Sequence, residues 1–528
     1  MFIDFNANPS SPELQGDICL VGSGVIGLAL CSHLLAHTNL RLILLESGDL
    51  GGAPDDAAVP AELNTGDIDS GVADSRARGF GGSSQRWAGQ ALPFSANDLA
   101  PRPYLNGAGW PVRLGDLEPY YAMATRFLGL DERPFSADLW NEPALSGLFA
   151  PASPLGLNFS KYSPHPNLAP LWRQRIAASD RVICLTNAHA THLEVDADHQ
   201  RVSGVAIRSR QGRPGRVRAQ RVVLCAGGVE NPRLLLASDQ VHPRGLGNDH
   251  DLVGRYYQDH VGFYGAHLEP LDWRAFRHLF ASFVQGRHKF VPKLQLTDAA
   301  QCSLQLLNVT GNLGVQLEET APVLGLRRLY NNLRHGALGR HNLRDLKMLP
   351  KAPLESAKIL YSHVVQGRIR IPRESRIFLI ANAESEPLRD SRIQLASERD
   401  AYGLRRARIH WLVSDRTRVA LDAYFAEVKR VLEGAGIARV HRNPMLAETN
   451  DDWKSRGYSL YHHMGGTRMA SRPEDGVVNP DSRVFSLANL YVAGSSVFPT
   501  GSSSNPTFTA LALSFRLAEH LAAASPTP

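Results

Sequence analysis

Cysteine is scarce in this chain and never arranged in pairs. The 528 residues include Cys19, Cys31, Cys184, Cys225 and Cys302, and no two of these form a CxxC motif. Most of them are flanked by leucine, isoleucine or valine. This pattern predicts reduced thiols in the core and argues against both a zinc site and a disulfide framework.

Long hydrophobic runs and a leader-like N-terminus are missing as well. No uninterrupted apolar stretch approaches the ~20 residues that a membrane-spanning helix needs. The first residues, MFIDFNANPSSPELQGD, lack a basic segment followed by an apolar one, so we expect no signal peptide and a cytoplasmic location. Hydrophobic residues make up 43% and charged residues 20%, as in an ordinary globular protein with room for two or three domains.

The net charge of +6 comes from one segment. Residues 327–370 hold ten Lys or Arg and two acidic residues, which leaves the rest of the chain close to neutral. The segment predicts two or three amphipathic helices with solvated basic faces. Alternatively it is a surface for an anionic ligand, a partner or a membrane face. It has too few aromatics for nucleic-acid stacking, and we expect no nucleic-acid partner.

The best-organised stretch of the sequence lies near the N-terminus. An apolar strand at 18–21 leads into the GxGxxG turn of residues 22–27, then a helix to about 37 and a second strand that ends at Glu46. Gly22 permits the tight turn, Gly24 lets the backbone approach a pyrophosphate, and Gly27 allows close packing of helix on strand. The helix N-terminus would face phosphates, and Glu46 would accept from ribose hydroxyls. This spacing predicts a dinucleotide site.

Two later glycine-rich stretches fit the same site, although the first motif does not separate NAD(P) from FAD. Gly81 and Gly82 precede two serines and Trp87, which suits a flavin held some distance from its ADP half. A buried strand at 222–225 then leads into Ala226, Gly227 and Gly228 and a helix that starts near residue 231. This second stretch returns the chain to the nucleotide-binding sheet, or is simply a strand-to-helix turn.

Taken together with C-terminal motifs, the sequence resembles the glucose–methanol–choline (GMC) oxidoreductase family over nearly its whole length. The motifs include LVGRYYQDH at 252–260 and YHHMGGTRM at 461–469, and the likeness is weak at about 265–380. Within the family, HMGGTRM, GWPVRLGDLEPYY and ESEPLRDSRIQLASERDAYG are most similar to the branch of pyranose oxidases and related sugar or polyol dehydrogenases.

The resemblance implies an α/β fold, with a Rossmann-like FAD-binding domain of non-contiguous segments and an α+β substrate domain on an antiparallel sheet. We expect FAD-binding parts at 1–125, 181–260 and 455–528, a substrate-domain or cap segment at 126–180, and the substrate-binding domain at 261–454. The residues agree locally. Alternating or β-branched patterns at 282–298, 302–313, 375–387 and 391–397 predict strands, and 415–436 predicts an amphipathic helix that ends at Gly434 or Gly436.

The family oxidises an alcohol by moving its proton to a base and its hydride to flavin N5, and histidine is a natural base. The Gly–Thr spacing of HMGGT aligns the family's catalytic histidine with His463, and the second active-site position with Asn505. Asn505 also suits a helix N-cap with Pro506 at the first helical position. The helix would aim its positive end at the flavin N1/C2 carbonyl.

The role of His462 stays open. It is a residue that packs or supports its neighbour or, as the minority interpretation, a residue that contacts the substrate. We expect substrate contacts from His463 and Asn505, and no metal, because adjacent residues seldom point together and no Cys or carboxylate cluster accompanies them.

The resemblance also implies a set of FAD-binding residues. These are Gly22, Gly24, Ile26, Gly27, Glu46, Ser47, Arg78, Gly81, Gly82, Ser83, Ser84, Trp87, Gly89, Ala226, Gly227, Gly494, Asn505, Pro506 and Thr507. Two positions depart from many relatives. Arg86 stands where some members carry a histidine that tethers FAD, so we expect non-covalent FAD. Gly494 stands where many members have Asp.

The function that follows is FAD-dependent oxidation of a CH–OH group of a sugar, glycoside or related polyol. The alternatives are oxidation of a non-sugar alcohol, a redox-silent flavin lyase of the hydroxynitrile lyase type, and a scaffold that keeps the fold. The intact His463–Asn505 pair argues against a scaffold, and the sugar-branch motifs argue against a lyase. The electron acceptor (oxygen, a quinone or a redox protein) and the oligomeric state stay open.

Overall fold

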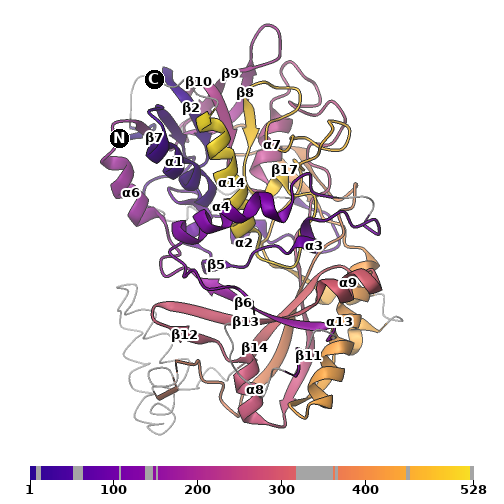
Figure 1. Ribbon diagram of the computed structural model, residues 1–528. Helices are drawn as coiled ribbons and strands as arrows, with labels where there is room; N and C mark the ends of the chain where they lie inside the picture. Colours follow the sequence, from indigo (N-terminus) through magenta and orange to yellow (C-terminus); the bar gives the residue numbers. More distant parts are fainter. Residues whose placement is uncertain are drawn as a thin grey trace.

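The structure is a computed structural model that describes residues 1–7, 13–51, 63–105, 109–136, 147–149, 153–316, 361–362, 367–447 and 452–523. Two sheets dominate it, one in the upper half of Figure 1 and one in the lower half. The fold is α/β with a Rossmann-like part and an antiparallel substrate part, as expected from the sequence.

The upper sheet is assembled from segments far apart in the chain. Its order is β1-β7-β3-β2-β10-β9-β8, with β20 paired to β10. All pairs are parallel except β10–β9 and β9–β8. The strands are β1 (Phe2–Asp4), β2 (Glu13–Val21), β3 (Leu42–Leu45), β7 (Val182–Thr186), β8 (His189–Val195), β9 (Val202–Arg208), β10 (Pro214–Leu224) and β20 (Leu490–Val492).

Helices surround this sheet because its central strands are apolar on both faces and need cover on each side. In β3, for example, all four residues are buried. Helix α14 contacts both α1 and α4 (Figure 1). The helices are α1 (Val25–His37), α4 (Leu114–Phe127), α6 (Ala169–Ala177), α7 (Glu230–Ala237) and α14 (Pro506–Ala523).

The lower sheet is antiparallel and follows the order β18-β11-β15-β14-β13-β6-β5, with β12 beside β13 and β19 beside β11. The strands are β5 (Gln90–Ala91), β6 (Leu155–Tyr162), β11 (Val261–Pro270), β12 (Phe283–Gln285), β13 (His288–Leu296), β14 (Val309–Gln316), β15 (Arg376–Ala383), β18 (Ala438–Arg442) and β19 (Tyr458–Ser459). Helices α8 (Trp273–Phe280), α9 (Asp298–Leu304) and α13 (Asp415–Gly434) belong to the same half (Figure 1).

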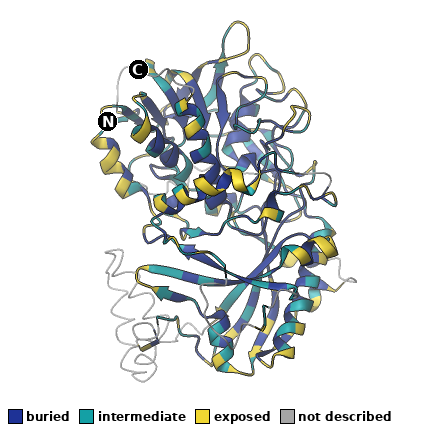
Figure 2. Cartoon of the chain, in the orientation of Figure 1, coloured by how far each residue is buried: buried dark blue, intermediate teal, exposed yellow. Residues whose placement is uncertain are grey.

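Helix α13 packs its buried side against this sheet, while its outer side is intermediate or exposed (Figure 2). The contact is close: a side chain at Gly265 of β11 would lie 1.8 Å from the Phe425 ring. The opposite, polar side of the strands carries Asn312 and Lys293, whose ammonium donates to the Asn312 carbonyl at 2.9 Å. Three large clusters of buried side chains result, one at the antiparallel sheet and one on each face of the upper sheet.

Several local expectations differ from the structure. Residues 302–304 belong to helix α9, because Thr297 accepts from the amide of Ala300 and starts a helix where we expected a strand. The strand at 391–397 exists as β16 (Arg392–Arg399), but it lies in a separate small sheet with β17 (Arg405–His410) and β4 (Leu63–Asn64). Four cysteines are buried as expected, whereas Cys302 is exposed.

The structure bears on the basic segment, on membrane insertion and on the segment 126–180. Most of the basic segment 327–370 lies outside the described residues. Across the described part of the chain, no helix is both long and apolar enough to cross a bilayer. In the segment 126–180, β6 joins the antiparallel sheet, while α6 packs beside β7 of the upper sheet.

Candidate functional site

The GxGxxG turn connects β2 to α1 at the carboxyl edge of the upper sheet. Gly22 has a φ of +117°, which side chains rarely tolerate. A Cβ at Gly27 would lie 2.0 Å from the carbonyl oxygen of Gly22, so glycine is required for the helix to approach the strand. A Cβ at Gly24, in contrast, would meet no protein atom within 4 Å. The turn therefore leaves open space beside Gly24, where a pyrophosphate fits.

Glu46, directly after β3, ties two other loops to this turn. Its Oε2 accepts from the Ser23 hydroxyl at 2.5 Å and the Ser23 amide at 3.3 Å. Its Oε1 accepts from the amides of Gly48 (2.9 Å) and Gly79 (3.0 Å). Sequence reasoning expected Glu46 to bind ribose. In the structure the carboxylate is buried and organises the rim of the site.

A cavity of about 300 Å³ runs from this turn to the histidines of the YHHMGGTRM motif, and we call it the central cavity. Thirteen of the expected cofactor residues line it, namely Gly22, Gly24, Ile26, Glu46, Ser47, Arg78, Gly82, Ser83, Ala226, Gly227, Gly494, Pro506 and Thr507. Six of them do not line it: Gly27, Gly81, Ser84, Trp87, Gly89 and Asn505.

The residues that do not line the cavity support its walls. Ser84 donates to the Gly81 carbonyl, and the Trp87 indole donates to the Pro166 carbonyl at 2.7 Å. Gly494 lines the cavity with a φ of +107°, a conformation that disfavours the Asp of many relatives.

Sequence reasoning missed several residues of the cavity. Ser75, which ends α2 (Val72–Ser75), and Arg76 enter it from the stretch before the second glycine motif. His189 enters from the start of β8, and Tyr461 precedes the histidine pair with 51% of its surface exposed. No motif marks these positions. The one available signal was that Tyr461 adjoins His462.

At the other end of the cavity, the segment with both histidines is paired to the YYQDH segment. Met464 and Gln258 exchange two backbone hydrogen bonds of 2.9 Å. Asp259 is fully buried, and its Oδ1 accepts from the backbone amides of His260 (2.6 Å) and His462 (2.9 Å). Asp259 therefore fixes the backbone beside the two histidines, and both histidine side chains line the cavity.

His463 is held from both sides of its ring. Its Nδ1 lies 2.7 Å from the Tyr257 hydroxyl and 3.4 Å from Asp259 Oδ2, and its Nε2 lies 3.1 Å from the Ser75 hydroxyl. Burial, with a smaller contribution from Arg76, lowers the pKa of His463 to about 3. Burial raises the pKa of Asp259 to about 7. His463 is therefore neutral at ordinary pH, with a ring nitrogen directed at a hydroxyl in the cavity.

His462 makes different contacts. Its Nδ1 lies 2.8 Å from Nδ1 of His260, and its Nε2 lies 3.0 Å from the Asn505 side-chain nitrogen. The sequence hypothesis paired Asn505 with His463, whereas the hydrogen bond of the structure joins Asn505 to His462. Burial and the neighbouring His260 lower the pKa of His462 well below its ordinary value.

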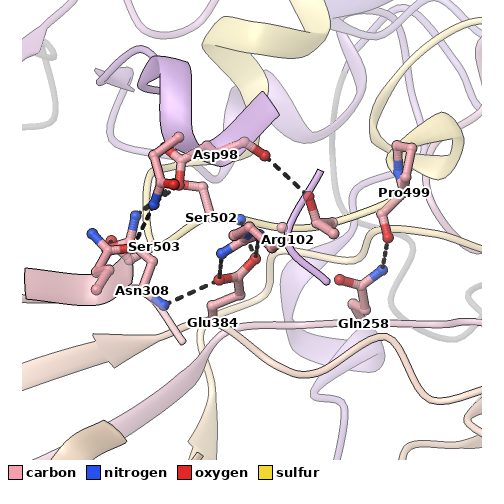
Figure 3. Close-up of polar contacts among 12 residues, drawn as sticks. Asp98, Arg102, Gln258, Asn308, Glu384, Pro499, Ser502 and Ser503 are labelled. Atoms are coloured by element: carbon pink, nitrogen blue, oxygen red, sulfur yellow. Dashed lines mark hydrogen bonds and ion pairs between the residues drawn. The ribbon is translucent and has the colours of Figure 1, made fainter. Parts of the chain in front are cut away.

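Asn505 ends a loop, residues 499–505, that side chains of both halves hold in place (Figure 3). Arg102 and Glu384 form a buried two-pronged ion pair with N–O distances of 2.7 and 2.6 Å. Glu384 also accepts from the backbone amides of Asn308 and Ser502, both at 3.1 Å. This pair thus ties the antiparallel sheet to the loop that presents Asn505.

Further side chains fix the remainder of the 499–505 loop. The Gln258 amide donates to the Pro499 carbonyl at 3.2 Å (Figure 3). The Trp110 indole donates to the Thr500 hydroxyl at 2.9 Å. Helix α14 then starts at Pro506, and its first turn lines the cavity. The positive end of a helix of this length favours negative charge at its N-terminus.

The residues that line the cavity are suited to hold a dinucleotide flavin. The open space beside Gly24 suits a pyrophosphate, and the N-termini of two helices, α1 and α14, point at the cavity from its two ends. Within the described ranges, no group of three or more His, Cys, Asp or Glu side chains is placed to hold a metal ion.

Comparison with known proteins defines the class. Two family models described as GMC oxidoreductase match the chain, an N-terminal one at residues 174–262 and a C-terminal one at 387–514. The chain belongs to the GMC oxidoreductase family and is an enzyme that acts on CH–OH groups. Membership of this family implies FAD as the cofactor.

Relatives of established activity are distant. The fructose dehydrogenase large subunit of Gluconobacter japonicus is 22% identical over 97% of this chain and 98% of its own. The 6'''-hydroxyparomomycin C oxidase of Streptomyces lividus is 23% identical over 98% of this chain and 93% of its own. The C-glycoside 3-oxidase of Arthrobacter globiformis is 36% identical, but over only 23% of this chain and 22% of its own.

Solved structures resemble the fold. A pyridoxine 4-oxidase from Mesorbium loti superposes with a TM-score of 0.60 at 18% identity, covering 96% of this chain and 98% of that one. A formate oxidase superposes with a TM-score of 0.54 at 14% identity, covering 97% and 99%. At such identities the likeness concerns the fold alone.

Proposed function

We propose that the enzyme oxidises a CH–OH group of a sugar, glycoside or related polyol to the carbonyl. When bound, FAD supplies the acceptor for the hydride. The observation that carries the proposal is the position of His463, whose Nε2 lies 3.1 Å from the Ser75 hydroxyl, inside the cavity where a flavin fits. A substrate hydroxyl that takes the place of this contact would donate to the same nitrogen.

His463 is suited to receive that proton. Burial keeps its ring neutral, and in the tautomer that donates from Nδ1 towards Asp259 the lone pair is at Nε2. Asp259 stands 3.4 Å from Nδ1 and would stabilise the imidazolium after the proton arrives, as a buried carboxylate does beside other catalytic histidines. The Tyr257 hydroxyl, 2.7 Å from Nδ1, holds the ring in this orientation.

The sugar class is supported by the relatives whose names state a substrate, which include a fructose dehydrogenase, a C-glycoside oxidase and an aminoglycoside oxidase. Lys293 of the antiparallel sheet donates to Asn312, and its charge acts on His462 of the cavity. Polar groups close to the histidine end suit a polyhydroxylated substrate better than an apolar alcohol.

The test is an anaerobic panel of sugars, glycosides and simple alcohols, with the flavin absorbance near ~450 nm as readout. We expect bleaching by a member of the sugar panel. A yellow spectrum that no alcohol changes would instead favour the redox-silent lyase. With the best substrate, His463→Ala is expected to slow bleaching by about 10²–10⁴-fold while FAD is retained. The control is His267→Ala, an exposed histidine on β11.

Non-covalent binding of FAD is part of the proposal. Arg86, at the place of the tethering histidine in some relatives, donates to the Asp74 carbonyl at 3.1 Å and offers no nucleophilic ring nitrogen. Acid precipitation should therefore release all the yellow colour into the supernatant. Flavin that stays in the pellet would show a covalent bond elsewhere.

A further inference from the structure

A chain of four hydrogen-bonding groups crosses the histidine end of the cavity. Nε2 of His260 lies 3.1 Å from the carbonyl oxygen of Gly501. Nδ1 of His260 lies 2.8 Å from Nδ1 of His462. Nε2 of His462 lies 3.0 Å from the side-chain nitrogen of Asn505. The two rings meet nearly at right angles, with centroids 4.9 Å apart.

The carbonyl at one end gives this chain a direction. A carbonyl oxygen only accepts, so Nε2 of His260 must carry the hydrogen. In a neutral ring Nδ1 is then an acceptor, and His462 must donate to it from its own Nδ1. The Nε2 of His462 consequently has a lone pair, which only a donor can approach. Each tautomer is thus fixed by its neighbour, starting from Gly501.

Neutrality of both rings is consistent with their surroundings. His260 is fully buried and His462 is half-buried, and burial lowers the pKa of His260 to about 4. The ammonium of Lys293, which is buried and bonded to Asn312, also disfavours a positive charge on His462. Glu384 is a carboxylate whose charge acts on His260, and it opposes the lowering of that pKa without reversing it. Asp259 contacts the backbone amides of these two histidines, and its side chain faces the ring of His463.

We propose that His260 and His462 are positioning residues that fix the orientation of the Asn505 amide. Its nitrogen must face the lone pair of His462, because the reverse orientation would place the carbonyl oxygen there. The second N–H and the carbonyl oxygen of Asn505 then remain, and they make no other hydrogen bond with the described residues. Asn505 lies between His462 and Pro506, which both line the cavity, and is half-buried.

This orientation defines what Asn505 offers to a substrate. The remaining N–H can donate to the hydroxyl oxygen that loses its proton to His463, where negative charge develops. The carbonyl oxygen can accept from a neighbouring hydroxyl. A donor and an acceptor on one amide match a vicinal diol, the arrangement found in sugars and polyols. The part of this inference that concerns the substrate rests on the proposed function, whereas the part that concerns the tautomers does not.

The tautomers can be measured without turnover. In protein labelled with ¹⁵N-histidine, ring nitrogen shifts distinguish a protonated from an unprotonated nitrogen. Variants at residues 260 and 462 would assign the signals. Between pH 6 and 8 we expect His260 protonated at Nε2 and His462 at Nδ1. A His462 that is protonated at Nε2, or charged, would overturn the proposal, whatever the substrate is.

Variants separate positioning from a purely structural role. His260→Leu removes the acceptor for His462, whereas His260→Asn keeps a carbonyl oxygen near the place of Nδ1. With the best substrate of the panel, we expect His260→Leu to slow flavin reduction by about 10²-fold, with FAD content unchanged. His260→Asn should recover most of the rate. Equal losses in both variants would contradict a positioning role.

Two further variants complete the design. His33→Leu changes a buried histidine on α1, remote from the cavity, and should leave the rate unaltered. Asn505→Asp replaces the donor by an acceptor, so His462 should take up a proton at Nε2, seen in its ¹⁵N shift even if His260→Leu fails to fold. An unchanged His462 signal in Asn505→Asp would refute the proposed direction of the chain.

Discussion

The two ends of the central cavity are built by different means. At the glycine end, the backbone forms the site, since Gly24 leaves open space and Gly27 allows close packing. At the histidine end, buried side chains from distant segments hold each other, with Asp259 and Glu384 as the fixed points. One end therefore depends on the absence of side chains, and the other on hydrogen-bond networks that join both halves of the molecule.

The largest effect that we expect is at the glycine end. Gly27→Ala brings a Cβ to 2.0 Å from the Gly22 carbonyl oxygen and should abolish both FAD retention and normal stability. Gly24→Ala is its matched control, because its Cβ meets no protein atom. It should unfold at the same denaturant concentration without cofactor, within ~0.5 kcal/mol. It should nevertheless bind FAD at least about tenfold more weakly, which is ~1.4 kcal/mol.

Chemical denaturation and FAD titration measure these two quantities separately. If Gly24→Ala lowered stability as much as Gly27→Ala, the difference between open space and packed backbone at this turn would be refuted.

The next effect concerns the ion pair of the 499–505 loop. Glu384→Gln leaves the buried Arg102 cation without its partner and should lower the free energy of unfolding by about 3–5 kcal/mol. The double variant Arg102→Met with Glu384→Leu removes both charges and should be less destabilised than the single one. Denaturant unfolding checks this order, and a single variant as stable as the native protein would contradict it.

The smallest effect is a pH dependence of stability. Burial lowers the pKa of His189 and His463 to about 3 and that of His260 to about 4. Below pH 6.5 the unfolded chain binds protons at these histidines before the folded one does, so stability falls as pH falls. Each contributes ~1.4 kcal/mol per pH unit.

Asp259 acts in the opposite direction, because its pKa in the folded protein is about 7. Between about pH 4 and 7, the folded chain holds a proton on Asp259 and the unfolded chain does not, so this group makes stability rise as pH falls. Of the three histidines above, two are therefore uncompensated and contribute roughly 2–3 kcal/mol of loss from pH 6 to pH 5. His462, whose pKa is also lowered, adds to this loss. Denaturant unfolding at the two pH values measures it, with His260→Asn expected to lose ~1.4 kcal/mol less. Equal stability at both values would show that these histidines are not kept neutral.

The sequence predicted the glycine end well because its signals are local. A turn, a helix and two strands follow one another within 30 residues, and the order of apolar and glycine residues reflects their contacts directly. The same holds for α13, whose apolar spacing matches the side that packs on the sheet.

The histidine end could be predicted only in part. His462, His463 and Asn505 were found through the family motifs, but their partners were not, because contacts across 200 residues leave no trace in local spacing. The partnership of Asn505 with His462 and not His463 depends on how two loops meet. The strand expected at 302–313 begins only at Val309, because the local cap Thr297 starts helix α9, which includes residues 302–304.

The link between Glu384 and the 499–505 loop has a consequence for altering specificity. Strands β14 and β15 lie in the substrate half and are natural targets for exchange between relatives. Glu384 and Asn308, which hold the loop, lie immediately beside those strands. A graft that replaced them would move the 499–505 loop together with the antiparallel sheet. Chimeras should therefore keep these two residues as an invariant frame and exchange only the side chains between them.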